Sequence, residues 1–111
     1  MGLDTTHSAW SGSCSRFHQW RRYIADLNGI NLDQMDGFGG DKEFDLKDDL
    51  TPLLSHSDCD GILTPEECER IARALTNMLE RGIDEDFIEK TETFRDGGLL
   101  AVSKNENIEF R

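Results

Sequence analysis

The chain has 111 residues, and 23 acidic against 12 basic side chains give it a formal charge of −11. This length predicts one domain, and the charge excludes a basic face that would bind nucleic acid directly. The single valine, Val102, argues against an all-β fold, because strands favour β-branched residues. No apolar run is long enough to span a membrane and no secretory signal opens the chain, so we expect no membrane contact and a cytoplasmic location.

The first predicted helix runs from Ser13, a capping residue, to Leu27, and Asn28-Gly29 would end it. Its apolar residues recur every three or four positions on one face: Phe17, Trp20, Ile24 and Leu27. Its polar residues are expected mostly on the opposite face: His18, Arg21 and Arg22. Such a stripe is typical of a helix packed on a core.

Residues 30–49 predict a long irregular segment around the glycines at 37, 39 and 40. Phe38, Phe44 and Leu46 are expected to anchor it to the core. Between residues 33 and 49 the chain has two lysines, at 42 and 47, and seven carboxylates: Asp33, Asp36, Asp41, Glu43, Asp45, Asp48 and Asp49. A short helix from about Asp48 to Ser55 is expected next.

The second long helix is predicted to start after Thr64, because Thr64 and Glu67 form a capping box around a first-turn proline. It should end at Arg81-Gly82 and bury one stripe: Cys68, Ile71, Ala72, Leu75, Met78 and Leu79.

The third long helix should start after Asp84 and end near Asn105. At Gly97-Gly98 either the helix breaks or two helices touch closely. Residues 107–111 alternate in polarity and predict a strand, for which residues 1–4 are the expected partner. The predicted fold is mainly α, with α+β as the alternative: three longer helices around one core, a long acidic loop and a short two-stranded terminal ribbon.

Residues 56–67 resemble an EF-hand calcium loop, which places oxygen ligands at alternating positions and a glutamate at the twelfth. The candidate metal ligands are His56, Asp58, Asp60, the Ile62 carbonyl, Thr64 and Glu67. His56 departs from the pattern, because aspartate is usual at the first position and calcium prefers oxygen. A turn followed by a capped helix would select most of these residues without any metal.

The odd number of cysteines, three, favours reduced thiols. Zinc bound by His56, Cys59, Cys68 and His7 is a further alternative to calcium, although the spacing matches no common zinc template. Cys59 near His56 suggests a nucleophile and its base, but no third group is identifiable, and we expect no enzyme activity. Residues 1–6 fit the loose N-myristoylation template, yet the acidic chain lacks the second signal that stable anchoring needs.

Several segments together resemble a family of small proteins of uncharacterised activity from bacteriophages, prophages and bacterial genomes: MGLDTTH, FHQWRR, HSDCDG, TPEEC, IARAL and SKNENIEF. The resemblance spans nearly the whole chain, and HSDCDG is its most specific part. It implies a small phage-linked protein in a bacterial cytoplasm. Ile62 stands where we expect an acidic residue in relatives, which removes one local ligand.

Two functions are compatible with these patterns. The first is a non-catalytic acidic protein that imitates a phosphate track and binds, or as an anti-defence or anti-CRISPR protein inhibits, a host nucleic-acid-handling protein. Its candidate contact residues are the seven carboxylates between Asp33 and Asp49, with Asp84, Glu85, Asp86, Glu89 and Glu92. The second is an EF-hand-like module that binds calcium or a similar cation.

Overall fold

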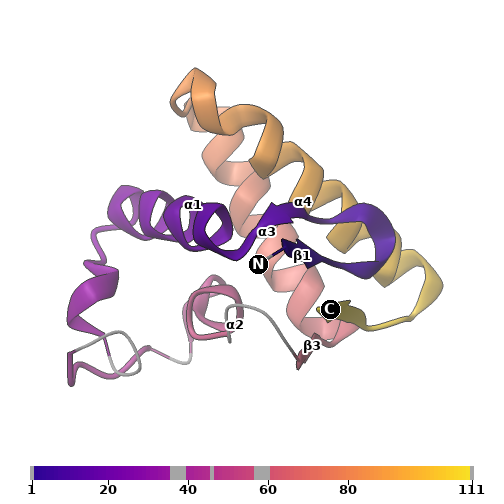
Figure 1. The fold of residues 1–111 in the computed structure, drawn as a ribbon, viewed down its shortest axis with the longest axis horizontal. Helices are drawn as coiled ribbons and strands as arrows, with labels where there is room; N and C mark the ends of the chain where they lie inside the picture. Colours follow the sequence, from indigo (N-terminus) through magenta and orange to yellow (C-terminus); the bar gives the residue numbers. More distant parts are fainter. Residues whose placement is uncertain (1, 36–39, 46, 57–60, 111) are drawn as a thin grey trace.

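The computed structural model describes residues 2–35, 40–45, 47–56 and 61–110. It confirms a mainly α-helical fold with three longer helices: α1 (Cys14–Leu27), α3 (Pro65–Arg81) and α4 (Glu85–Lys104). Helices α3 and α4 form an antiparallel hairpin, and α1 lies across it (Figure 1). In the described part of the chain, no helix is both long and apolar enough to cross a membrane.

Four short strands form two antiparallel ribbons. β1 (Gly2–Asp4) pairs with β2 (Ser11–Ser13), and β3 (Gly61–Leu63) pairs with β4 (Ile108–Phe110). The predicted strand near the C-terminus is confirmed, but its expected pairing with residues 1–4 is wrong. β1 pairs instead with a strand seven residues further on, across the 3-10 turn η1 (Thr6–Ser8), and a short connection costs little closure entropy. One bridge, Thr5 with Phe110, still joins the two ends.

An aromatic cluster forms the centre of the core. The ring centroids of Trp10 and Phe17 are 5.1 Å apart, and those of Trp20 and Phe94 are 5.2 Å apart. The indole Nε1–H of Trp20 donates to the Thr91 hydroxyl at 3.0 Å. The cluster therefore joins α1, α4 and the segment before β2 through rings, and the buried indole of Trp20 is satisfied.

The glycine pair in α4 does not break the helix, which runs unbroken to the left-handed cap Asn105. A Cβ on Gly97 would lie 2.5 Å from the Ala9 Cβ, whereas a Cβ on Gly98 would lie 3.5 Å from the Cys68 carbonyl oxygen. The closest approach is therefore at Gly97, between α4 and the residue that follows η1. The expected contact between two helices is at Gly98, which packs against Cys68 and Ala72 of α3.

The start of α3 confirms the predicted capping box. The Thr64 hydroxyl accepts from the Glu67 backbone N–H at 3.2 Å, and a Glu67 carboxylate oxygen accepts from the Thr64 N–H at 2.9 Å. Gly82, with a φ of 92°, ends the helix where predicted. The stripe that includes Cys68 and Leu75 is buried as expected.

Two predictions for α1 are wrong. Arg21 is completely buried instead of facing away from the core, and Leu27 is 47% exposed at the helix end. The short helix α2 (Thr51–Leu54) is also shorter than predicted. Phe44 packs half-buried against the core as expected, and the predicted anchors at 38 and 46 lie outside the described residues.

Candidate functional site

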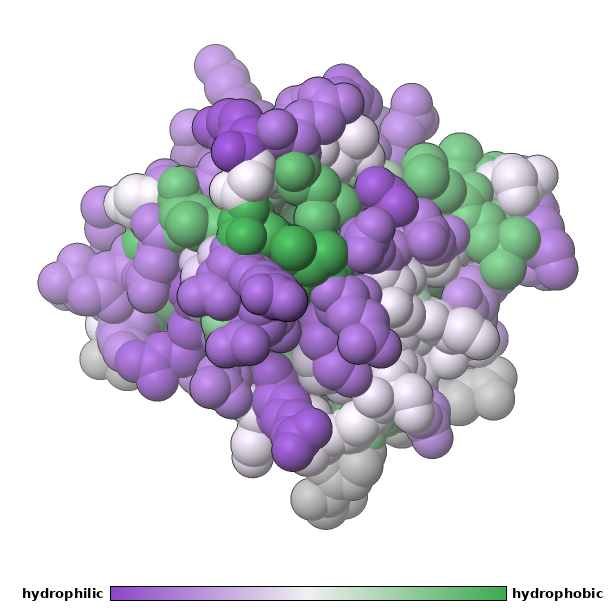
Figure 2. Space-filling model, turned by 90° about the horizontal axis from the view of Figure 1, so that it is seen from above, coloured by the Kyte–Doolittle hydropathy of each residue, from purple (hydrophilic) through white to green (hydrophobic). Residues whose placement is uncertain are grey.

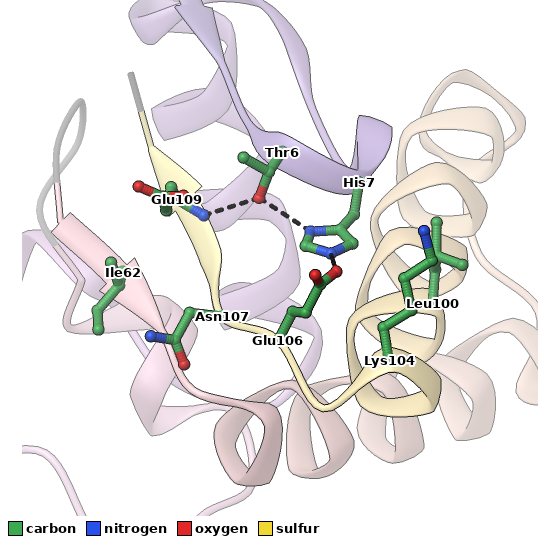
Figure 3. Close-up of a pocket in the computed structure, with 8 residues that line it drawn as sticks. All are labelled: Thr6, His7, Ile62, Leu100, Lys104, Glu106, Asn107 and Glu109. Carbon is green, nitrogen blue, oxygen red and sulfur yellow. Dashed lines mark hydrogen bonds and ion pairs between the residues drawn. The ribbon is translucent and has the colours of Figure 1, made fainter.

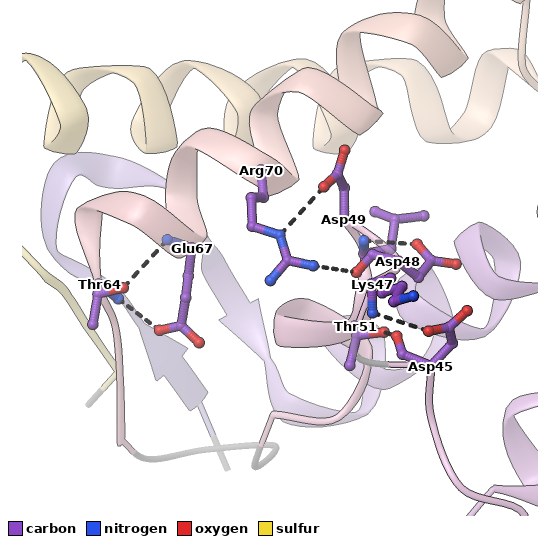
Figure 4. Close-up of polar contacts among 9 residues, drawn as sticks. Asp45, Lys47, Asp48, Asp49, Thr51, Thr64, Glu67 and Arg70 are labelled. Atoms are coloured by element: carbon purple, nitrogen blue, oxygen red, sulfur yellow. Dashed lines mark hydrogen bonds and ion pairs between the residues drawn. The ribbon is translucent and has the colours of Figure 1, made fainter.

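The described ends of the EF-hand-like loop make local hydrogen bonds. The His56 Nε2 lies 3.0 Å from the Ile62 carbonyl oxygen, the backbone ligand that the calcium prediction requires. Because a carbonyl only accepts, this nitrogen carries the proton. Thr64 and Glu67 are engaged in the capping box (Figure 4). The other two predicted ligands, Asp58 and Asp60, lie outside the described residues.

The zinc alternative gains no support from the residues that are described. Among them, no group of three or more His, Cys, Asp or Glu side chains could hold a metal ion. His7 and His56 bond to other partners, and Cys68 is a free, buried thiol. The expectation of reduced thiols is wrong for Cys14, which is disulfide-bonded.

The Cys68 thiol stays protonated at neutral pH. Burial raises its pKa from 9.0 to about 11, a backbone hydrogen bond at Ile108 opposes the shift, and the nearby Glu67 charge adds to it. Its Sγ–H points to the Leu63 carbonyl oxygen at 3.8 Å. A thiol that stays protonated at neutral pH is a poor nucleophile and a poor metal ligand.

Part of the acidic loop is neutralised within the fold. Arg70 of α3 donates to an Asp49 carboxylate oxygen at 3.2 Å and to the Asp48 carbonyl at 2.8 Å (Figure 4). The side chains of Asp48 and Asp45 each accept a backbone N–H from two residues on, at 2.9 and 3.0 Å. These carboxylates therefore shape a turn and fasten it to α3, which explains them without an outside partner.

The rest of the loop is less engaged. Asp33 pairs with Arg22 at 2.5 Å on the surface, and Asp36 lies outside the described residues. Asp41 and Glu43 are exposed, and their side chains form no hydrogen bond or ion pair within the described part of the chain.

The second group of predicted contact residues lies at the start of α4, far from the acidic loop, so the structure does not bring the two groups together (Figure 1). Asp84 caps the helix by accepting from the Asp86 N–H at 3.0 Å. Glu85, Glu89 and Glu92 follow at helical spacing on one exposed stripe, which we call the acidic stripe. Seen from the side at which α4 begins, the surface is mostly hydrophilic, with small apolar patches (Figure 2).

A hollow of about 590 Å³ lies between η1, the end of α4 and β4 (Figure 3). His7 connects its walls, because Nδ1 lies 2.9 Å from the Thr6 hydroxyl and Nε2 lies 2.9 Å from a Glu106 carboxylate oxygen. The Thr6 oxygen also accepts from the Glu109 N–H at 2.9 Å. The hydroxyl proton is therefore available to His7 Nδ1, and His7 Nε2–H donates to Glu106.

This hydroxyl–imidazole–carboxylate order is that of a catalytic triad, but the described side chains that line the hollow do not complete one. In a working triad, the Thr6 hydroxyl would attack a substrate carbonyl, and polar donors would have to converge on the oxygen of that carbonyl. The ends of Lys104 and Asn107 lie apart from the Thr6 hydroxyl (Figure 3). His7 has a left-handed φ of 62°, and the bonds that hold it there tie the N-terminal segment to the C-terminal one. The hydrogen bonds of Thr6 and His7 therefore hold the N-terminal and C-terminal segments together.

Arg21 has a structural role that its position in the sequence was not expected to give it. Its guanidinium donates to the His56 carbonyl at 2.6 Å and to the Leu53 carbonyl at 3.3 Å, and lies 4.7 Å from the centre of the Phe17 ring. Arg21 thus ties α1 to the end of α2 from inside the core. The available signal was its spacing, since it stands four residues after Phe17 and three before Ile24, within the apolar stripe.

Among the predicted site residues that are described, the acidic stripe is the group whose side chains the fold leaves exposed and unbonded on one regular element. Comparisons of the chain with protein-family models, with curated proteins and with solved structures find no match.

Proposed function

We propose that the protein is a non-catalytic binding protein whose acidic stripe contacts a basic surface of a partner protein. The observation that carries the proposal is the state of Glu85, Glu89 and Glu92. All three are exposed, and their side chains have no hydrogen bond or ion pair within the described residues. Their charge is therefore available to another molecule.

The stripe also costs the fold some stability. Like charges three or four residues apart on a helix each destabilise it by about 0.2–0.5 kcal/mol. Glu85 is partly compensated, because it lies in the first turn, where the helix dipole favours negative charge. Glu89 and Glu92 lie beyond that turn. A run of like charges that forms no ion pair within the described residues suits an external, positively charged partner.

The spacing of the stripe supports a partner that handles nucleic acid. Carboxylates three and four residues apart place one charge about every 5 Å along the helix axis. A DNA strand carries one phosphate about every 3.4 Å, so the two charge densities are of the same order. We infer that the partner is a host nucleic-acid-handling protein whose basic groove the stripe occupies. Inhibition of that partner, as an anti-defence or anti-CRISPR protein, is the expected consequence.

The test captures partners from a bacterial lysate at low salt and compares two variants with the same change in charge. The stripe variant carries E85Q, E89Q and E92Q, and the control carries D26N, E69Q and E80Q at exposed positions that are not among the candidate contact residues. The proposal predicts a basic protein that the wild type and the control retain and the stripe variant loses. Equal retention by both variants, or no basic protein at all, would refute it.

A further inference from the structure

The exposed face of α4 continues beyond the acidic stripe. The helix is unbroken over its 20 residues, and residues three or four positions apart lie on the same side of a helix. At that spacing, the residues that follow Glu92 on this face are Asp96, Leu99 and Leu100, and all three are exposed. The stripe and the two leucines therefore belong to one surface, which extends for about 22 Å at about 1.5 Å per residue.

The two leucines, which we call the leucine pair, are neighbours and both face solvent. Leu99 is 48% and Leu100 41% exposed, and among the described large apolar residues Leu27 and Ile62 are exposed to a similar extent, 47% each. In Figure 2 an apolar patch lies toward the side on which α4 ends in Figure 1. Exposed apolar side chains that gather in one place within a polar surface are typical of an interaction site, whereas scattered ones need no explanation.

The leucine pair also borders a concave site. Leu100 lines the hollow of about 590 Å³ beside η1, and the exposed Ile62 of β3 lines the same hollow from another side (Figure 3). An apolar side chain of a partner that packs on Leu100 can therefore enter a depression in the surface. Side chains that fill such depressions usually supply most of the binding energy of a protein interface.

The charge of the surface changes between its two halves. The carboxylates of the acidic stripe form no ion pair within the described residues. Asp96, one turn beyond Glu92, pairs instead with the Arg95 guanidinium at 3.0 Å. The unpaired negative charge thus ends before the leucine pair begins. A partner that fits both halves must carry cations and, about 10 Å further along the helix axis, an apolar group.

We propose that the leucine pair is the apolar half of the interface formed by the acidic stripe, and that one basic partner protein covers both halves. The inference rests on the proposed function, because the same partner must bind the stripe. Charges on exposed surfaces mainly speed association, whereas differences in affinity between variants of one interface lie mostly in the dissociation rate. The stripe and the leucine pair should therefore affect different rate constants.

The test uses the basic protein from the lysate capture, purified and immobilised, as the probe. L99Q and L100Q replace an apolar side chain by another good helix former, and L27Q removes a leucine of matching exposure at the end of α1. Burial of a half-exposed leucine predicts that L99Q and L100Q each speed dissociation about five- to tenfold and leave the salt dependence unchanged. L27Q should bind like the wild type, as should L99M and L100M, which keep the apolar surface. The stripe variant should instead slow association and flatten the salt dependence.

The outcomes separate this inference from the proposed function. If no basic protein is retained through the stripe, the proposed function fails and the inference fails with it. If a protein is retained through the stripe but L99Q and L100Q bind it as L27Q does, the inference alone is overturned. Sedimentation velocity provides the remaining check: a wild-type dimer that L99Q and L100Q dissociate would show that a second copy covers the leucine pair, and would also overturn the inference. Circular dichroism confirms that each variant is folded.

Discussion

The neighbouring glycines of α4 should respond with opposite signs to the same added methyl group. A Cβ on Gly97 would lie 2.5, 2.6 and 2.9 Å from the Cβ, Cα and N atoms of Ala9. Carbon atoms in contact normally stay about 3.5–4.0 Å apart, so the backbone at Ala9 would have to move. A Cβ on Gly98 would meet its nearest neighbours at 3.5–3.9 Å, which is ordinary contact.

The magnitudes follow from two opposing effects. Replacing a helical glycine by alanine gains about 1 kcal/mol in both variants. In Gly97→Ala, the clash with backbone atoms of Ala9 places the overpacking cost at about 2–3 kcal/mol, which leaves a net loss of about 1–2 kcal/mol. At about 4 °C per kcal/mol, Tm should fall by about 4–8 °C for Gly97→Ala and rise by about 4 °C for Gly98→Ala. Thermal unfolding followed by helical circular dichroism measures both, and shifts of the same sign would refute the close contact with Ala9.

Three further predictions test other parts of the fold. Thr64→Ala should cost about 1 kcal/mol in urea unfolding, because it removes one half of the capping box, whereas Thr64→Ser should cost much less; equal losses would contradict the cap. Thr91→Val leaves the buried indole of Trp20 unpaired and should cost about 1–3 kcal/mol, and an unchanged stability would contradict the hydrogen bond. The Cys68 pKa is raised from 9.0 to about 11 in the folded state, so the unfolded chain releases its proton first. Stability relative to Cys68→Ala should therefore fall as pH rises from 9.0 to about 11, and a flat difference would contradict the burial of the thiol.

Local signals in the sequence were enough to predict the helices. The α3 cap depends on residues three positions apart, and the α1 stripe on residues three or four apart, so both are visible without the fold. The strand at Ile108–Phe110 was equally visible from its alternation. What such signals could not supply was the partner of each strand, because pairing depends on which segments the helices bring together.

The errors concern contacts between distant residues. Arg21 was expected on the helix face opposite the apolar stripe, yet it lies in the core, where it contacts carbonyls at the end of α2 and a ring of α1. At Gly97 the sequence indicated only a break or a close contact, and the contact is with Ala9, 88 residues earlier. For the predicted sites, the sequence showed where the clusters of carboxylates lie along the chain. Only the structure separated those engaged by Arg70 from those of the acidic stripe.

The most direct test of the proposed function is the affinity of the captured basic partner for the wild type and for the stripe variant as salt increases. Exposed charge pairs are screened over a Debye length, which shrinks from about 14 Å to about 4 Å between about 50 and about 500 mM salt. We predict that wild-type binding collapses over this range, and that replacing Glu85, Glu89 and Glu92 by glutamine removes most of the affinity at low salt. Binding that is indifferent to salt and equal in the two proteins would contradict the account.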